Sequence, residues 1–176
     1  AELELDIPDP ITFEEAVKAS RRHVPDTRAN CFGCSSLRSE DDGLHLRSGP
    51  VEGRDLVAID WTPRAAAVGA GDGEEVPEPV VWAGMECATY RAMEIGGMRQ
   101  DDEVVLLGRM TSKVQALPKV GQPCFFMGWP VERDGRKIRL GGSLHDQGGR
   151  VMVVSELLCV ALKPGLTFES FASGQA

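Results

Sequence analysis

The sequence predicts an α+β domain in which an antiparallel sheet wraps round a single buried helix. Residues 79–97 are the one segment long and apolar enough for that helix, with Pro79 suited to its start and the Gly96-Gly97 pair to its end. Two strand-like segments precede it, and four more follow with turn residues between them. One buried helix followed by strands in hairpin order is typical of a sheet packed on that helix.

The expected helix is apolar on nearly every side. Residues at three-to-four spacing form one apolar face, and they are Val81, Met85, Ala88, Ala92 and Ile95. The opposite side is hardly more polar, with Ala83, Gly84, Cys87 and Met93. We therefore expect this helix to be buried almost all round, with its small residues allowing close contact with other backbone.

The chain before this helix begins with a shorter one. Thr12 and Glu15 form a capping-box pattern that predicts a helix over residues 13–20, lying on the outside. Residues 31–34 predict a tight turn containing glycine. Residues 44–51 and 56–61 then read as two strands, and residues 65–77 as an exposed loop leading into the central helix.

Four strands are expected after the central helix. They cover residues 104–116, 124–132, 137–145 and 151–162, and Asp134-Gly135 is a hairpin signal between the second and the third. Because side chains alternate along a strand, the face of the sheet away from the helix should be exposed unless another subunit covers it.

Composition narrows the class of protein. A chain of 176 residues with 42% hydrophobic and 26% charged residues suits one soluble domain. The net charge of −8 argues against bulk attraction to nucleic acid or to an anionic membrane. No stretch has the length of a membrane span, and five cysteines without a secretory pattern predict reduced thiols and a cytoplasmic location.

Several short groups of residues, in this order and spacing, resemble the hotdog-fold acyl-CoA thioesterase superfamily, and most closely small actinobacterial thioesterase-like proteins. They are Cys31-Phe-Gly-Cys34 with Gly43-Leu-His-Leu46, Trp61-Thr-Pro63, Val81-Trp-Ala83 with Glu86-Cys87, Leu107-Gly-Arg-Met-Thr111, and Gly128-Trp-Pro130 with Asp134-Gly-Arg-Lys137. The resemblance implies one hotdog-like domain over residues 1–176, with a core of about residues 31–162. The resemblance implies a curled sheet round the helix, a homodimer or dimer of dimers joined at sheet edges, and an acyl-thioester site at the dimer interface near the helix start.

The sequence departs from the better-characterised enzymes of that superfamily at the helix. Those enzymes commonly have His-Gly-Gly at the helix start and an acidic residue two turns on, where this chain has Trp82-Ala83-Gly84 and Arg91. Glu86 is the nearest carboxylate. Partial burial would suit it as a general base for the water that attacks a thioester. The alternative is only a favourable interaction with the helix dipole.

Further residues of the helix are expected to bind substrate. Backbone N–H groups of Ala83, Gly84 and Met85 would hold the thioester carbonyl and its oxyanion, although small residues here also suit close helix–sheet packing. Trp82 would border the carbonyl site, and Tyr90 is placed in the pocket by proximity alone.

A basic hairpin and the cysteines complete the set of candidates. Arg136 and Lys137, flanked by Arg133 and Arg139, would contact the phosphates of CoA or else form ordinary solvated surface. Cys87 is a candidate nucleophile, but without a neighbouring histidine it is better explained as core. Cys31 and Cys34 have the spacing of a zinc knuckle, but no second close pair exists, so we expect a packed turn with no metal and no cofactor.

These observations leave two main hypotheses. The first is hydrolysis of an acyl-CoA or related thioester, with Glu86 as the catalytic residue. The second is a non-catalytic protein that binds acyl-CoA or another acyl ligand, with Trp82 narrowing the carbonyl site. A hotdog dehydratase is a weaker third idea, because that chemistry needs a histidine that this helix lacks.

Overall fold

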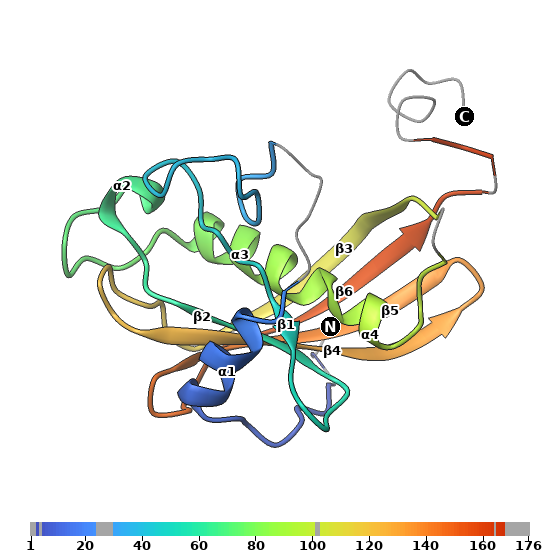
Figure 1. The fold of residues 1–176 in the computed structure, drawn as a ribbon, viewed down its shortest axis with the longest axis horizontal. Helices are drawn as coiled ribbons and strands as arrows, with labels where there is room; N and C mark the ends of the chain where they lie inside the picture. The colour runs from blue at the N-terminus through green and yellow to red at the C-terminus, as the bar shows by residue number, and fades with distance from the viewer. Residues whose placement is uncertain (1–2, 4, 24–29, 101–102, 164, 168–176) are drawn as a thin grey trace.

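The computed structural model describes residues 3, 5–23, 30–100, 103–163 and 165–167. Within them, one antiparallel sheet of six strands curls round a central helix (Figure 1). The strands are β1 (Gly49–Pro50), β2 (Val57–Trp61), β3 (Val105–Val114), β4 (Cys124–Asp134), β5 (Lys137–Asp146) and β6 (Val151–Ala161), in the order β1-β2-β4-β5-β6-β3. The helices are α1 (Phe13–Ser20), α2 (Ala65–Val68), α3 (Glu78–Tyr90) and α4 (Ala92–Ile95). The predicted fold class is confirmed.

The long strands agree with the sequence prediction to within two residues at each end. In the β4–β5 hairpin Asp134 faces Lys137, so Gly135 and Arg136 form the turn. Gly135 has a φ of 56°, a backbone conformation that glycine adopts without steric cost. Local turn chemistry therefore sets the register of the two strands that carry most of the helix contacts.

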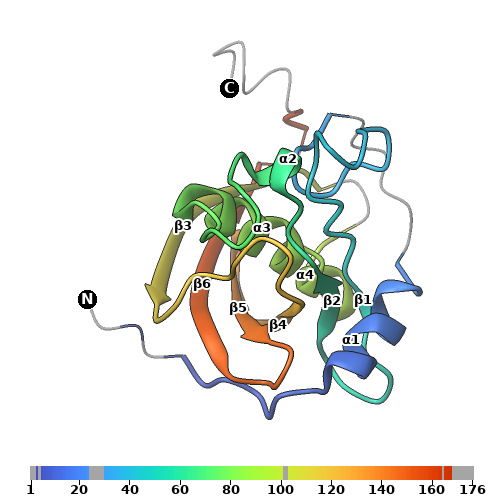
Figure 2. The ribbon, with the colours of Figure 1, turned by 90° about the vertical axis from the view of Figure 1, so that its left-hand side faces the viewer.

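Small residues let α3 lie close against the concave face of the sheet, which Figure 2 shows wrapped round the helix. A Cβ atom added at Gly84 would lie 3.0 Å from the Phe126 ring, and one added at Gly128 would lie 2.8 Å from Thr89 Cα. A Cβ at Gly142 would meet Thr89 Oγ1 at 2.2 Å. Glycines on both surfaces are thus required for the close approach.

α1 covers part of the convex face of the sheet. Both capping-box hydrogen bonds form, with Glu15 N donating to Thr12 Oγ1 at 3.2 Å and Thr12 N donating to Glu15 Oε2 at 2.8 Å. Ala16 and Ala19 are buried against a cluster that includes Phe125, Met127 and Trp129. The expectation that only another subunit could cover this face is therefore incomplete, because the N-terminal helix of the same chain does so over β2 and β4.

Two predicted elements before the central helix differ in the structure. The strand expected over residues 44–51 is reduced to β1, because His45 has a φ of 55°, which interrupts an extended segment. Leu44 N and Leu46 N instead donate to the carbonyls of Phe32 and Gly33, at 2.9 and 2.7 Å. In the loop expected over residues 65–77, the first four residues form the short helix α2.

The central helix is interrupted near its end. The expected span of residues 79–97 is divided at Arg91 into α3 and α4. Val81, Met85, Ala88 and Ala92 are buried as predicted, while Ile95 is half-buried. None of the helices in the described ranges has both the length and the apolar character needed to cross a membrane.

Candidate functional site

The face of α3 that turns away from the sheet carries the candidate site. Trp82, Ala83, Glu86 and Cys87 are half-buried, whereas Val81, Met85 and Ala88 on the sheet side are fully buried. The prediction of a helix buried almost all round is therefore wrong on this side. The outer face presents one carboxylate, one thiol and one indole ring among small apolar residues.

A shallow depression marks the start of α3. It has a volume of about 400 Å³ and is lined by Glu78, Pro79 and Trp82. The Trp82 indole Nε1 donates a hydrogen bond of 3.2 Å to Glu78 Oε1, which fixes the ring beside the first turn of the helix. Trp82 thus lies near the helix start, where the thioester carbonyl is expected to bind.

The expected oxyanion donors need correction. Because α3 begins at Glu78, Ala83, Gly84 and Met85 lie in its second turn, where backbone N–H groups donate within the helix. Gly84 and Met85 also face the sheet, and Met85 is fully buried. Gly84 therefore serves the close helix–sheet packing that was the alternative explanation.

Glu86 lies near the middle of α3 and not close to its start. It is the ninth of thirteen helical residues, so more than two turns separate it from the first backbone N–H groups. The interaction of a charge with the helix dipole falls off within one turn, so the dipole explanation does not apply to this residue. Burial chiefly, and then the charge of Glu86, raises the pKa of the Cys159 thiol to about 12.

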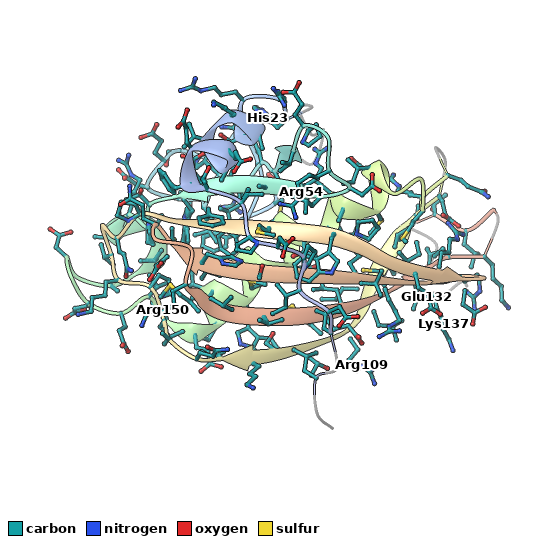
Figure 3. The ribbon with its side chains drawn as sticks, turned by 90° about the horizontal axis from the view of Figure 1, so that it is seen from below. His23, Arg54, Arg109, Glu132, Lys137 and Arg150 are labelled. Carbon is teal, nitrogen blue, oxygen red and sulfur yellow. The ribbon has the colours of Figure 1, made fainter. Side chains whose placement is uncertain are left out.

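Three of the expected binding residues lie away from the helix start. Tyr90 ends α3, and its hydroxyl donates to the Val105 carbonyl at 2.9 Å. Arg136 donates to the Ala161 carbonyl at 3.2 Å, and Lys137 is exposed. Both basic residues lie at the hairpin tip, where Figure 3 shows Lys137 at the opposite end of the sheet from Arg150.

The direction of α3 along β4 explains this separation. Gly84 lies against Phe126, Thr89 against Gly128 and Gly96 against Pro130, so the helical segment runs from the start of β4 towards its end. The hairpin tip follows the end of β4 and therefore lies beyond the C-terminal end of the helix. Within one chain, the structure does not bring Arg136 and Lys137 to the depression at Trp82.

A cluster of three cysteines was not predicted. Cys87 on α3 lies beside the turn of residues 31–34, with its sulfur 3.5 Å from that of Cys31. The sulfur atoms of Cys31, Cys34 and Cys87 all lie within 4.8 Å of one another. The expected assignment of Cys87 to the core is incomplete, since this half-buried residue faces the turn. The Cys-Phe-Gly-Cys spacing was the one signal of it in the sequence.

The pKa values of Cys31 and Cys87 move in opposite directions. A hydrogen bond from Cys87 lowers the pKa of Cys31 to about 4, against the opposing effect of burial and with help from the backbone N–H groups of Cys34 and Gly33. The same hydrogen bond, together with one to Cys34 and burial, raises the pKa of Cys87. The arrangement therefore favours a thiolate on Cys31, the half-buried cysteine of the turn.

An open polar cleft lies between residues 36–47 and the end of β2. Its volume is about 540 Å³, and Arg38, His45 and Arg64 are among its lining residues. Arg64 forms ion pairs with Glu40 at 2.6 Å and Asp41 at 3.2 Å, while Arg38 pairs with Asp42 at 2.9 Å. These acidic partners neutralise both guanidinium groups.

Comparison with known proteins defines the fold. No protein-family model and no curated protein matches the chain. A Thermus thermophilus hypothetical protein, described as a thioesterase superfamily member, aligns with a TM-score of 0.56 at 10% identity over 68% of this chain and 90% of its own. A Bacillus halodurans protein with CoA aligns with a TM-score of 0.55 at 12% identity over 68% of this chain and 76% of its own.

A further thioesterase superfamily protein aligns with a TM-score of 0.55 at 19% identity over 64% of this chain. The aligned part spans about half of that protein, 52% of its length. At such identities the likeness defines the architecture and leaves the activity open. The curled six-stranded antiparallel sheet, the central helix and these structural neighbours together show that the chain has the hotdog fold of thioesterase superfamily proteins.

Proposed function

We propose that this protein hydrolyses acyl-CoA or a related acyl thioester on the outer face of α3. The observation that carries the proposal is the carboxylate of Glu86, half-buried on the side of the central helix that the sheet leaves uncovered. The fold is that of thioesterase superfamily proteins, and a structural neighbour from Bacillus halodurans was crystallised with CoA. A partly buried carboxylate is suited to accept a proton from water.

In the proposed reaction Glu86 acts as the general base. It removes a proton from a water molecule while that water attacks the thioester carbonyl, and the thiolate of CoA then leaves. The depression at Glu78, Pro79 and Trp82 supplies an apolar surface for the acyl group. The small side chain of Ala83 is still proposed to border the substrate on the half-buried face of α3. Its backbone N–H is no longer proposed as an oxyanion donor.

The proposed ligand contacts at the hairpin require a second subunit. Because Arg136 and Lys137 lie beyond the far end of α3, they would meet the phosphates of CoA bound at Trp82 only from another copy of the chain. We include a homodimer, joined through the free edge of β3, in the proposal for this reason. The cytoplasmic location and the actinobacterial affinity expected from the sequence remain predictions.

A second candidate function is binding without catalysis. Trp82 stands where characterised thioesterases of this fold commonly have histidine, and its hydrogen bond to Glu78 holds the ring at the helix start. A ring fixed there narrows the approach to a carbonyl. This observation favours a protein that holds an acyl ligand and does not cleave it.

Steady-state hydrolysis of acyl-CoAs with short, long, branched and aromatic acyl groups tests the proposal. Product should be followed by chromatography, because a thiol reagent would also react with the half-buried cysteines Cys31 and Cys87. Calorimetric titration with CoA provides the second measurement. Turnover supports the enzyme, saturable binding without turnover supports the binding protein, and the absence of both contradicts the two functions together.

A further inference from the structure

The structure assigns Cys31, Cys34 and Cys87 as a site for one soft divalent cation such as Zn²⁺. Two of the three residues belong to a single turn, and the third comes from α3, 56 residues further along the chain than Cys31. This inference does not depend on the proposed function. It concerns a cluster that the thioester chemistry leaves unused.

The distances between the sulfur atoms suit tetrahedral coordination. A Zn–S bond of about 2.3 Å places two sulfur ligands of a tetrahedral ion ~3.8 Å apart. The Cys31 and Cys87 sulfurs are 3.5 Å apart, and no pair in the cluster exceeds 4.8 Å. Small rotations of the three side chains therefore bring all three sulfurs to ligand distance.

The backbone around the cluster holds it in place from two sides. Gly33 lies directly against Cys87, where a Cβ atom would be 2.2 Å from the sulfur, so the turn touches the helix without an intervening side chain. On its other side, the carbonyls of Phe32 and Gly33 accept hydrogen bonds from Leu44 N and Leu46 N. The turn is thus fixed to its neighbours before any ion binds, as a preorganised ligand site requires.

Three sulfur ligands favour a cation over a disulfide. A disulfide joins two cysteines and would leave the third thiol of the cluster without a partner. Among the described residues the cluster has three members, so a bound ion would keep one coordination position for water or another small ligand. Cys31 is half-buried, so the ion can enter from the solvent side.

Titration with Co²⁺ and Zn²⁺ tests the site. Fully reduced, chelator-treated full-length protein should bind one Co²⁺ per chain, with a sulfur-to-cobalt charge-transfer band and the intense visible bands of tetrahedral coordination. Zn²⁺ should then displace it. At a hundredfold excess over its dissociation constant, Zn²⁺ should raise the Tm by about 5–10 °C.

Cysteine variants locate the ligands. Cys31→Ser and Cys87→Ser should each abolish the charge-transfer band or weaken Co²⁺ binding at least tenfold. Cys159→Ser is the matched control, since it removes a buried thiol outside the cluster and should bind as the wild type does. If Cys87→Ser does not fold, Co²⁺ binding by Cys31→Ser alone tests whether the cluster holds the ion, because Cys31 is half-buried in the turn.

Alkylation of the wild type gives a readout that needs no variant. Zn²⁺ should protect the three clustered thiols from iodoacetamide, as mapped by mass spectrometry. Folded, reduced protein that shows neither the cobalt band nor this protection overturns the assignment. So does unchanged Co²⁺ binding by Cys31→Ser. A Cys31–Cys87 disulfide in the oxidised protein, with no metal binding in the reduced one, would identify a redox pair instead.

Discussion

The position of Glu86 along α3 separates two explanations that the sequence left open. A carboxylate in the first turn would be stabilised by the helix dipole, but Glu86 is the ninth residue of the helix. Its side chain is half-buried on the face that the sheet does not cover. The helix dipole therefore does not account for this carboxylate, and its proposed role as a general base is left to be tested by substitution.

Replacing Glu86 with glutamine removes the proton acceptor and keeps the size of the side chain. We expect kcat for acyl-CoA hydrolysis to fall by roughly a hundred- to ten-thousand-fold, with the affinity for CoA retained. Glu94→Gln on α4 is the control, because it changes a carboxylate that pairs with Arg91 and Arg99 and should leave kcat near the wild-type value. Full activity in folded Glu86→Gln protein would exclude Glu86 as the base.

His145 is a buried histidine held in its neutral form. Its ring stacks on Phe125 with centroids 4.8 Å apart. Since a carbonyl only accepts, Nδ1–H donates to Gly149 O at 3.1 Å, and Nε2 accepts from the Ser143 hydroxyl at 2.7 Å. Burial lowers the pKa of His145, while the Gly149 carbonyl and the charge of Asp146 act in the opposite direction.

This lowered pKa makes the free energy of unfolding depend on pH. The unfolded chain binds a proton at His145 near pH 6.5, whereas the folded chain does so only at lower pH. The stabilisation from neutral His145 is therefore complete above about pH 6.5–7 and is lost as the pH falls towards the folded-state value. Urea denaturation at a series of pH values gives the free energy of unfolding at each pH. Below about pH 6.5 this free energy should fall less steeply with decreasing pH for His145→Gln than for the wild type. Equal slopes for His145→Gln and the wild type would contradict the assignment.

At the scale of the element, the β4–β5 hairpin was predicted from a local sequence signal, and the folded structure contains it. The Asp134-Gly135 pair predicted the turn, and Gly135 does adopt a positive φ. Nothing lies within 4 Å of a Cβ atom added there, so the backbone conformation alone limits which residue fits.

Gly135→Val should therefore destabilise the protein through backbone strain. A β-branched residue at this φ costs about 1–3 kcal/mol, whereas asparagine tolerates the conformation far better. Thermal unfolding should show a Tm lowered by several degrees for Gly135→Val and a smaller change for Gly135→Asn. An unchanged Tm in Gly135→Val would count against the role of this turn.

At the scale of the whole molecule, the two edges of the sheet are unequal. β1 has two residues, whereas β3 has ten and, among the residues that the structure describes, pairs with β6 along one side only. A long free edge presents unpaired backbone groups that a second strand can join. The half-buried Trp82 on the outer face of α3 adds apolar surface that a second copy would cover.

We expect a homodimer in which β3 pairs with β3 of a second copy. Sedimentation at micromolar concentration should give the mass of a dimer. Hydrogen exchange should find consecutive β3 amides protected, including the alternate ones that do not bond to β6. A monomer, or a dimer whose alternate β3 amides exchange rapidly, would rule out this pairing and any site shared across it.

The sequence by itself determined the local elements. Three features could be predicted because each depends on residues within a few positions of one another. They are the capping box at Thr12, the long strands after residue 104 and the apolar stripe of α3. Only the tertiary structure decided which of these surfaces meet. In the folded chain Cys87 lies beside the turn at Cys31, Gly84 faces Phe126, and Lys137 lies beyond the C-terminal end of the helix. These contacts follow from how far the sheet curls and where the helix lies on it, which depend on packing across the whole chain and leave no periodic signal in the sequence.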